Sequence, residues 1–158
     1  MLVNGVGSGL DLPLLPPGHR YVGLDLTRAM LARSLGRAGV LDFSAVQGDS
    51  LALPFRDASF DFAVLHLIVA VVPDATRALA ETARVVRRGG GILILDKFLK
   101  RGQSAPLRRL LNPLAAGVAT RLDVVFEDAL ERVPGLSVVT DEPAAAAGWF
   151  RIIRLQRL

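Results

Sequence analysis

The sequence predicts a doubly wound α/β domain, in which helices cover both faces of a mostly parallel sheet. Short apolar runs alternate with helix-like segments over residues 1–98. The run at 91–98 (GILILDKF) is continuously apolar, as in strands buried on both faces of a parallel sheet. With 158 residues, 51% of them hydrophobic, the chain can form one core without disulfides. We therefore expect one domain over residues 1–158.

The first half of the chain follows this alternation. Four apolar runs predict strands, the first breaking at Gly5, over residues 1–3, 20–26, 42–47 and 60–66. Thr27 is a predicted N-cap for a helix through Leu35, which Gly36 or Gly39 would end. Leu10–Leu15 is apolar and could begin another helix.

The second half begins with the clearest helix. Asp74 caps it, Leu79, Ala83 and Val86 share one face, and the Gly89–Gly91 triplet should stop it. Beyond the strand at 91–98, we expect helices at 105–116, interrupted by a proline, and at 124–132. Two late runs, at 136–140 and 149–155, predict an antiparallel hairpin at the sheet edge, with 144–147 as a loop.

A glycine-rich loop follows the first strand. Glycines at Gly5, Gly7 and Gly9 let the backbone approach a ligand, and a helix start would supply free N–H groups. Asp25 ends the second strand, where a carboxylate can accept hydrogen bonds from both ribose hydroxyls of an adenosine. This spacing fits NAD and S-adenosylmethionine equally well.

Two features separate these cofactors. The dinucleotide fingerprint G-x-G-x-x-G/A needs a third small residue where this chain has Leu10. Asp49 and Ser50 follow the third strand, where a carboxylate can accept from the adenine amino group. Leu26 and Leu51 are placed to sandwich the adenine ring. Both features favour S-adenosylmethionine.

Five motifs stand in order at spacings that resemble one family. They are Gly5–Gly9, 23–27 (GLDLT), 48–55 (GDSLALPF), 59–61 (SFD) and 84–90 (RVVRRGG). This series is similar to class I S-adenosylmethionine-dependent methyltransferases of the methyltransferase-11 or ubiquinone-biosynthesis type. Segments 9–14, 69–74 and 97–114 further resemble phosphatidylethanolamine N-methyltransferase-like members.

The resemblance implies a Rossmann-like sheet ordered 3-2-1-4-5-7-6 with strand 7 antiparallel, and S-adenosylmethionine as cofactor. It implies methyl transfer by in-line displacement to an N, O or C nucleophile of a small molecule or lipid. Together with the spacing arguments, it assigns cofactor contacts to Gly5, Val6, Gly7, Gly9, Asp25, Leu26, Asp49, Ser50, Leu51 and His66.

The chain departs from the family in three places. Val3 stands where an acidic residue usually helps to hold the methionine end, and Asn4 replaces an apolar strand residue. The family's N-terminal segment, which covers the cofactor, is missing from this sequence. A catalytically silent S-adenosylmethionine- or adenosine-binding module therefore stays open as the alternative to an active enzyme, with an NAD-binding domain as a distant third.

His66, at the predicted end of strand four, is the candidate catalytic residue. Ligands meet open α/β sheets at this edge, where an imidazole can act as a general base. Alternatively, His66 packs under the cofactor or only lines the pocket. His19, in a loop, is expected to be solvated. Asp96 and Lys97 end strand five and could face the acceptor, or Asp96 could cap the next segment.

Composition excludes several classes of protein. The chain has no cysteine and two histidines, which excludes disulfides, thiolate chemistry and a histidine-rich metal site, so no metal is expected. It shows neither a secretory signal nor a run of about 20 apolar residues, so we expect a cytoplasmic protein. Residues 97–121 hold six basic side chains and no acid. This stretch is either a solvated face or a contact for a membrane or phosphate-bearing partner; nucleic acid is unexpected, and a homodimer stays open.

Overall fold

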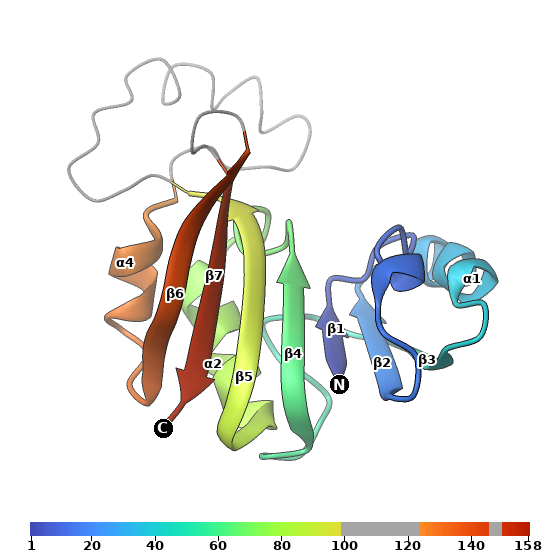
Figure 1. Cartoon of the computed structure of the whole chain (residues 1–158), viewed down its shortest axis with the longest axis horizontal. Coiled ribbons are helices and arrows are strands. Elements are labelled where there is room, and N and C mark those ends of the chain that lie inside the picture. The colour runs from blue at the N-terminus through green and yellow to red at the C-terminus, as the bar shows by residue number, and fades with distance from the viewer. Residues whose placement is uncertain (99–123, 146–149) are drawn as a thin grey trace.

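The computed structural model describes residues 1–98, 124–145 and 150–158. Within these ranges, strands form one seven-stranded sheet in the order β3-β2-β1-β4-β5-β7-β6 (Figure 1). The strands are β1 (Leu2–Asn4), β2 (Arg20–Asp25), β3 (Asp42–Gln47), β4 (Phe60–His66), β5 (Val86–Lys97), β6 (Leu136–Ala145) and β7 (Phe150–Arg157). Only β7 runs antiparallel to its neighbours β5 and β6 in this part of the chain, which confirms the expected order and direction.

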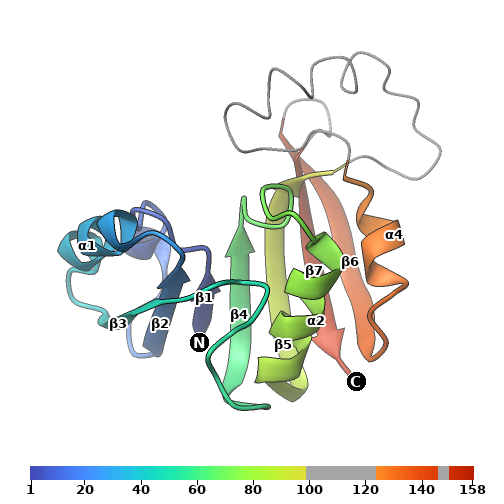
Figure 2. The ribbon, with the colours of Figure 1, turned by 180° about the vertical axis from the view of Figure 1, so that it is seen from behind.

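Helices lie on both faces of this sheet. The helical elements are η1 (Leu12–Leu14, a 3-10 turn), α1 (Arg28–Arg37), α2 (Ala75–Val85) and α4 (Phe126–Leu130). Side chains alternate between faces along a strand, so Val3 packs with α1 and η1, whereas Leu2 joins the larger core beneath α2 and α4. Figures 1 and 2 show α2 and α4 on the same side of β5 and β7.

Several element boundaries match the sequence pattern. The predicted strands at 42–47 and 60–66 have these bounds in the structure, and β2 ends at Asp25 as expected. Asp74 caps α2, since its Oδ1 accepts a hydrogen bond of 2.9 Å from the backbone N–H of Arg77. Thr27 occupies the N-cap position of α1 but makes no side-chain cap bond, and the helix runs through Gly36 to Arg37.

The predicted boundary between α2 and β5 was wrong. The helix ends at Val85, and the strand begins at Val86, so the glycine triplet lies inside β5. A Cβ at Gly90 would lie 2.7 Å from the Asp61 carbonyl oxygen, and one at Gly91 would lie 2.4 Å from the Phe62 ring. These glycines therefore allow β4 and β5 to approach closely, which a sequence pattern alone does not distinguish from a helix stop.

Other expectations were wrong in extent. Residues 10–15 form no α-helix but only η1, because Pro13 and the pair Pro16–Pro17 remove donors and restrict the residues before them. Helix α4 is shorter than the expected 124–132. The hairpin of β6 and β7 is confirmed, but β6 extends to Ala145, so Ala144 and Ala145 belong to the strand rather than to a loop. The expected helix at 105–116 lies outside the described residues.

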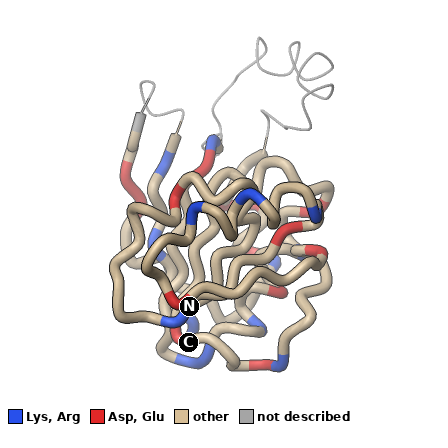
Figure 3. The backbone as a smooth tube through the Cα atoms, turned by 90° about the vertical axis from the view of Figure 1, so that its right-hand side faces the viewer, with Lys and Arg blue, Asp and Glu red and all other residues tan. Residues whose placement is uncertain are grey.

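The described surface carries both signs of charge. Figure 3 shows basic and acidic residues interspersed along the backbone on one side of the molecule. The basic stretch at 97–121 lies outside the described residues beyond Phe98. In the part of the chain that the structure describes, no helix is long and apolar enough to cross a membrane.

Candidate cofactor and active site

A cavity of about 670 Å³ lies at the carboxyl ends of the parallel strands, within the range of small-molecule sites. It is formed by the loops that follow β1, β2, β3 and β4, which meet at one edge because these strands are parallel. Its lining residues are Gly5, Gly7, Ser8, Asp25, Leu26, Thr27, Met30, Asp49, Ser50, Leu51, Leu67, Ile68, Val71, Val72 and Pro73.

The glycine-rich loop forms one wall of the cavity. The N–H groups of Gly5 and Val6 both donate to the carbonyl of Leu24, at 2.9 Å each, so the chain turns sharply at the end of β1. Gly5 and Gly7 have positive φ angles of 75° and 55°. A Cβ at Gly5 would lie 2.7 Å from Ile68, whereas nothing lies within 4 Å of one at Gly7. Gly5 therefore permits close packing, and Gly7 leaves its side of the loop open.

Asp25 connects this loop to the end of β2. Its Oδ2 accepts a 3.0 Å hydrogen bond from the N–H of Gly7, and its Oδ1 accepts a 2.8 Å bond from the N–H of Thr27. A carboxylate has about four acceptor positions, so these two bonds orient the group and leave others for a ligand. The arrangement fits the predicted contact with ribose hydroxyls.

The loop after β3 forms another wall of the cavity. Asp49 Oδ1 accepts a 2.8 Å bond from the N–H of Leu51, which turns the chain and directs Leu51 to the cavity. Ser50 is buried, and its hydroxyl donates to Asn4 Oδ1 at 2.6 Å. Asn4 Nδ2 in turn donates to Thr82 Oγ1 at 3.2 Å. A buried polar chain therefore links the cavity wall to β1 and α2.

Apolar side chains gather around the cavity. Leu26 is 68% exposed, and Met30, Leu67 and Val71 are 37%, 42% and 36% exposed. All four line the cavity. Large apolar side chains that remain exposed at a concave site are typical of ligand-binding surfaces.

Three of the predicted site residues do not line this cavity. Val6 is buried in the smaller core with α1, and Gly9 packs on α1, where a Cβ would lie 2.8 Å from the Cα of Ser34. Gly9 thus allows the loop to pack closely on α1. In the dinucleotide fingerprint, the third small residue, at the position of Leu10, has this role. His66 lies at the end of β4, where its Nδ1 forms a hydrogen-bonded pair with Asp11 Oδ2.

Asp96 faces the protein interior rather than a ligand. It is fully buried, and its oxygens accept hydrogen bonds from the backbone N–H groups of Ala70, at 2.9 Å, and Lys97, at 2.8 Å. Burial raises the pKa of the Asp96 carboxyl above its usual value, while the two N–H donors act in the opposite direction. The bond to Ala70 holds the segment after β4, whereas the alternative interpretation expected Asp96 to cap the segment that follows β5. That following segment lies outside the described residues beyond Phe98.

Sequence reasoning missed the contribution of the segment after β4. Ile68, Val71, Val72 and Pro73 line the cavity, although the run 69–74 was used only as a mark of resemblance. Their apolar character is equally typical of a strand end or a core. Their place at the cavity depends on tertiary contacts of this segment, such as the bond from the Ala70 N–H to Asp96 on β5.

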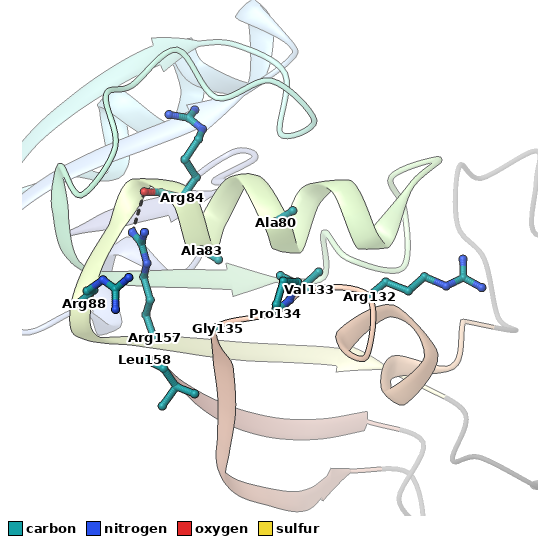
Figure 4. A pocket seen from close by; sticks show the side chains of 10 residues that line it. All are labelled: Ala80, Ala83, Arg84, Arg88, Arg132, Val133, Pro134, Gly135, Arg157 and Leu158. Atoms are coloured by element: carbon teal, nitrogen blue, oxygen red, sulfur yellow. Dashed lines mark hydrogen bonds between the residues drawn. The ribbon is translucent and has the colours of Figure 1, made fainter.

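A second cavity of about 370 Å³ lies at the opposite edge of the sheet, between the end of α2 and the start of β6 (Figure 4). The arginines there have structural contacts. Arg157 donates to the carbonyl oxygens of Arg84 and Val86 at the C-terminal end of α2. The Arg84 guanidinium points away from this cavity in Figure 4 and bonds to Asp57 and Glu81. This cavity is therefore distinct from the glycine-loop site.

The fold and the site together define an α/β protein that binds an adenosine-bearing cofactor at the carboxyl edge of its sheet. The cavity volume, the open glycine loop, the two carboxylates and the apolar walls all fit such a group. Among the described residues, no group of three or more His, Cys, Asp or Glu could hold a metal ion.

Comparison with known proteins identifies the family. The model of the methyltransferase-domain family matches residues 2–94. A phosphatidylethanolamine N-methyltransferase from Cereibacter sphaeroides is 35% identical over 164 aligned residues, which cover 99% of this chain and 79% of that protein. This chain therefore belongs to the S-adenosylmethionine-dependent methyltransferases, and its cofactor is S-adenosylmethionine.

Further relatives support the same family. A 2-phytyl-1,4-naphtoquinone methyltransferase from Synechococcus elongatus is 34% identical over 128 residues, covering 73% of this chain but only 54% of that protein. The structure of geranyl diphosphate C-methyltransferase from Streptomyces coelicolor, determined with S-adenosyl-L-homocysteine, has a TM-score of 0.79 at 14% identity. That likeness covers 99% of this chain and 70% of that one, and it shows the fold.

Proposed function

We propose that this methyltransferase acts on a lipid whose headgroup carries an amine, with phosphatidylethanolamine as the first acceptor to test. The observation that carries this proposal is the set of exposed apolar side chains at the cavity, in particular Leu67 and Val71 beyond the adenosine-binding walls. Two relatives described above, a phosphatidylethanolamine N-methyltransferase and a 2-phytyl-1,4-naphtoquinone methyltransferase, support it by their names.

Different parts of the cavity would bind the adenosine half and the methionine half of the cofactor. Asp25 would accept from the ribose hydroxyls and Asp49 from the adenine amino group, with Leu26 and Leu51 on either side of the adenine ring. The open face at Gly7 leaves room for the methionine half. When bound, the cofactor supplies an electrophilic sulfonium methyl group.

The protein's main task is then to position the acceptor. Holding a lone pair in line with the methyl group replaces a collision in solution by a reaction within one complex, with effective molarities of about 10⁵ M or more in favourable cases. An ammonium headgroup must also lose a proton before its nitrogen has a lone pair. His66, beside the cavity-lining Leu67, is our proposed general base for this proton.

The experiment uses labelled S-adenosylmethionine and lipid vesicles. We expect label to enter the headgroup in phosphatidylethanolamine vesicles. Phosphatidylcholine vesicles are the matched control, because a quaternary nitrogen has no lone pair to methylate. No incorporation into phosphatidylethanolamine by a protein that binds S-adenosylhomocysteine would refute this acceptor, and label in a quinone fraction instead would favour a carbon nucleophile.

A further inference from the structure

His66, which directly precedes the cavity-lining Leu67, forms a pair with Asp11, although 55 positions separate them in the chain. His66 is the last residue of β4, and Asp11 lies in the loop between the glycine loop and η1. His66 Nδ1 and Asp11 Oδ2 are in hydrogen-bond contact, and the two side chains are 28% and 27% exposed. The pair is thus only partly shielded from solvent.

Asp11 contacts His66 instead of capping η1, the 3-10 turn that follows it. It occupies the N-cap position of η1, where an aspartate normally accepts from the free N–H groups of the first turn. Its side chain makes no cap bond in the structure. The carboxylate is therefore directed across the loop to the imidazole rather than to its own helix.

Two residues that are close to the pair in the sequence line the cavity. Ser8, three positions before Asp11, and Leu67, directly after His66, both line it. Leu67 has a φ of 56°, a left-handed conformation that costs a non-glycine residue about 1 kcal/mol or more. Its N–H donates to the Leu95 carbonyl at 2.9 Å, so the strained turn is held in place by β5. The end of β4 is thus fixed beside the cavity at an energetic cost.

The contact determines which nitrogen of His66 is free. When an ionised carboxylate accepts from Nδ1, that nitrogen carries the proton in a neutral ring, and the Nε2 lone pair remains available. We propose that Asp11 is a positioning residue that holds His66 in the Nδ1–H form, so that Nε2 serves as the proton acceptor. This inference rests on the proposed function for its chemical use.

The acceptor ammonium gives one proton to His66 Nε2, and the resulting imidazolium is stabilised by the Asp11 carboxylate. The freed nitrogen lone pair forms the new N–C bond to the methyl carbon. The C–S bond breaks at the same time, and its electron pair stays on sulfur, which becomes a neutral thioether.

The tautomer can be measured without any acceptor. The chain has two histidines, so long-range ¹⁵N–¹H spectra at alkaline pH should resolve both rings, with His19→Asn assigning them. We expect the Nδ1–H form for His66 in the parent and its loss in Asp11→Ala, with His19 unchanged. Asp42→Ala is the matched control, since it removes an exposed carboxylate paired with Arg20. An Nε2–H form in the parent, or an unchanged His66 in Asp11→Ala, would overturn the proposal.

Kinetics test the same pair in catalysis. With phosphatidylethanolamine vesicles, His66→Ala should lower kcat about 100-fold, and Asp11→Ala about 10- to 100-fold, as for other positioned bases. The double variant should lose no more than His66→Ala, because the two residues act as a unit. S-adenosylhomocysteine affinity should change less than about twofold.

Two outcomes would contradict the role of Asp11 in catalysis. They are additive losses of kcat in the double variant, and an Asp11→Ala effect that is confined to melting temperature and cofactor affinity. Either would mean that Asp11 only holds its loop in place. Failure of the parent to methylate this lipid would count against the acceptor, while the tautomer measurement still decides the pair.

Discussion

The hydroxyl of Ser50 donates a 2.6 Å hydrogen bond to Asn4 Oδ1, and this bond joins the wall of the cofactor cavity to the last residue of β1. Asn4 is fully buried and is also bound to Thr82 on α2. An amide at a buried strand end is costly unless its groups are paired, and here both are. Asn4, which stands where the family has an apolar strand residue, therefore positions the loop after β3.

Replacing Asn4 should test this link. Asn4→Leu leaves the buried Ser50 hydroxyl without its acceptor, which costs about 1–3 kcal/mol and frees the 49–51 turn. We expect a lower melting temperature and about tenfold weaker S-adenosylhomocysteine binding by calorimetry. Thr82→Val is the matched control, since it removes the other partner of Asn4 and spares Ser50. Equal loss of affinity in both variants at similar stability would contradict a specific role for the Ser50 bond.

Asp25 should govern cofactor affinity. Asp25→Ala removes an acceptor for ribose hydroxyls and the two backbone bonds that hold Gly7 and Thr27. Hydrogen bonds to a charged group contribute about 1.5–3 kcal/mol each, partly offset by water. We expect S-adenosylhomocysteine to bind about 10- to 100-fold more weakly by calorimetry, with the fold intact by circular dichroism. Parent-like affinity would show that the ribose assignment is wrong.

Gly5 and Gly7 offer a comparison within one loop. Both have positive φ angles, so an alanine at either is strained by about 1 kcal/mol or more. Only at Gly5 would the new Cβ also lie 2.7 Å from Ile68. We therefore expect Gly5→Ala to lower the melting temperature more than Gly7→Ala, as measured by differential scanning calorimetry. The reverse order would mean that the Ile68 contact relaxes easily.

The Glu81–Arg84 pair on α2 holds the 53–57 loop. Glu81 Oε2 accepts from the Leu53 N–H at 2.8 Å, and Arg84 donates to the carbonyls of Leu53 and Phe55 at 2.9 and 2.8 Å. Hydrogen bonding to Arg84, helped by the Leu53 N–H and Arg77, lowers the pKa of Glu81, against the effect of burial.

This lowered pKa predicts how stability depends on pH. Because the folded-state pKa of Glu81 lies below its ordinary value of 4.5, the stabilisation is fully present above pH 4.5 and is lost as pH falls through the folded value. Glu81→Gln should cost about 1–3 kcal/mol at pH 7 in urea unfolding, and the difference from the parent should shrink on acidification. Asp42→Asn, at an exposed site, should show little change. A difference that is constant with pH would exclude the ionised pair as its source.

Much of the fold was predictable from the sequence because the relevant signals are local. The strands at 42–47 and 60–66 and the cap at Asp74 depend on residues a few positions apart. The glycine loop and Asp25 were likewise predictable, since parallel strands bring their carboxyl ends to one edge whatever the side chains beyond. In contrast, the glycine triplet at 89–91 was misassigned, because its meaning depends on how closely β4 approaches.

The sequence by itself thus determined the order of elements, the family and the residues that can accept hydrogen bonds from an adenosine. Only the tertiary structure decided which of these residues line the cofactor cavity together. In the structure, Gly9 packs on α1 instead of lining the cavity. Asn4 is hydrogen-bonded to Ser50, and Asp11 is hydrogen-bonded to His66. These pairings join segments far apart in the chain, and their side chains have several permissible partners. Packing of helices on both faces of the sheet selects one of them, which no local pattern encodes.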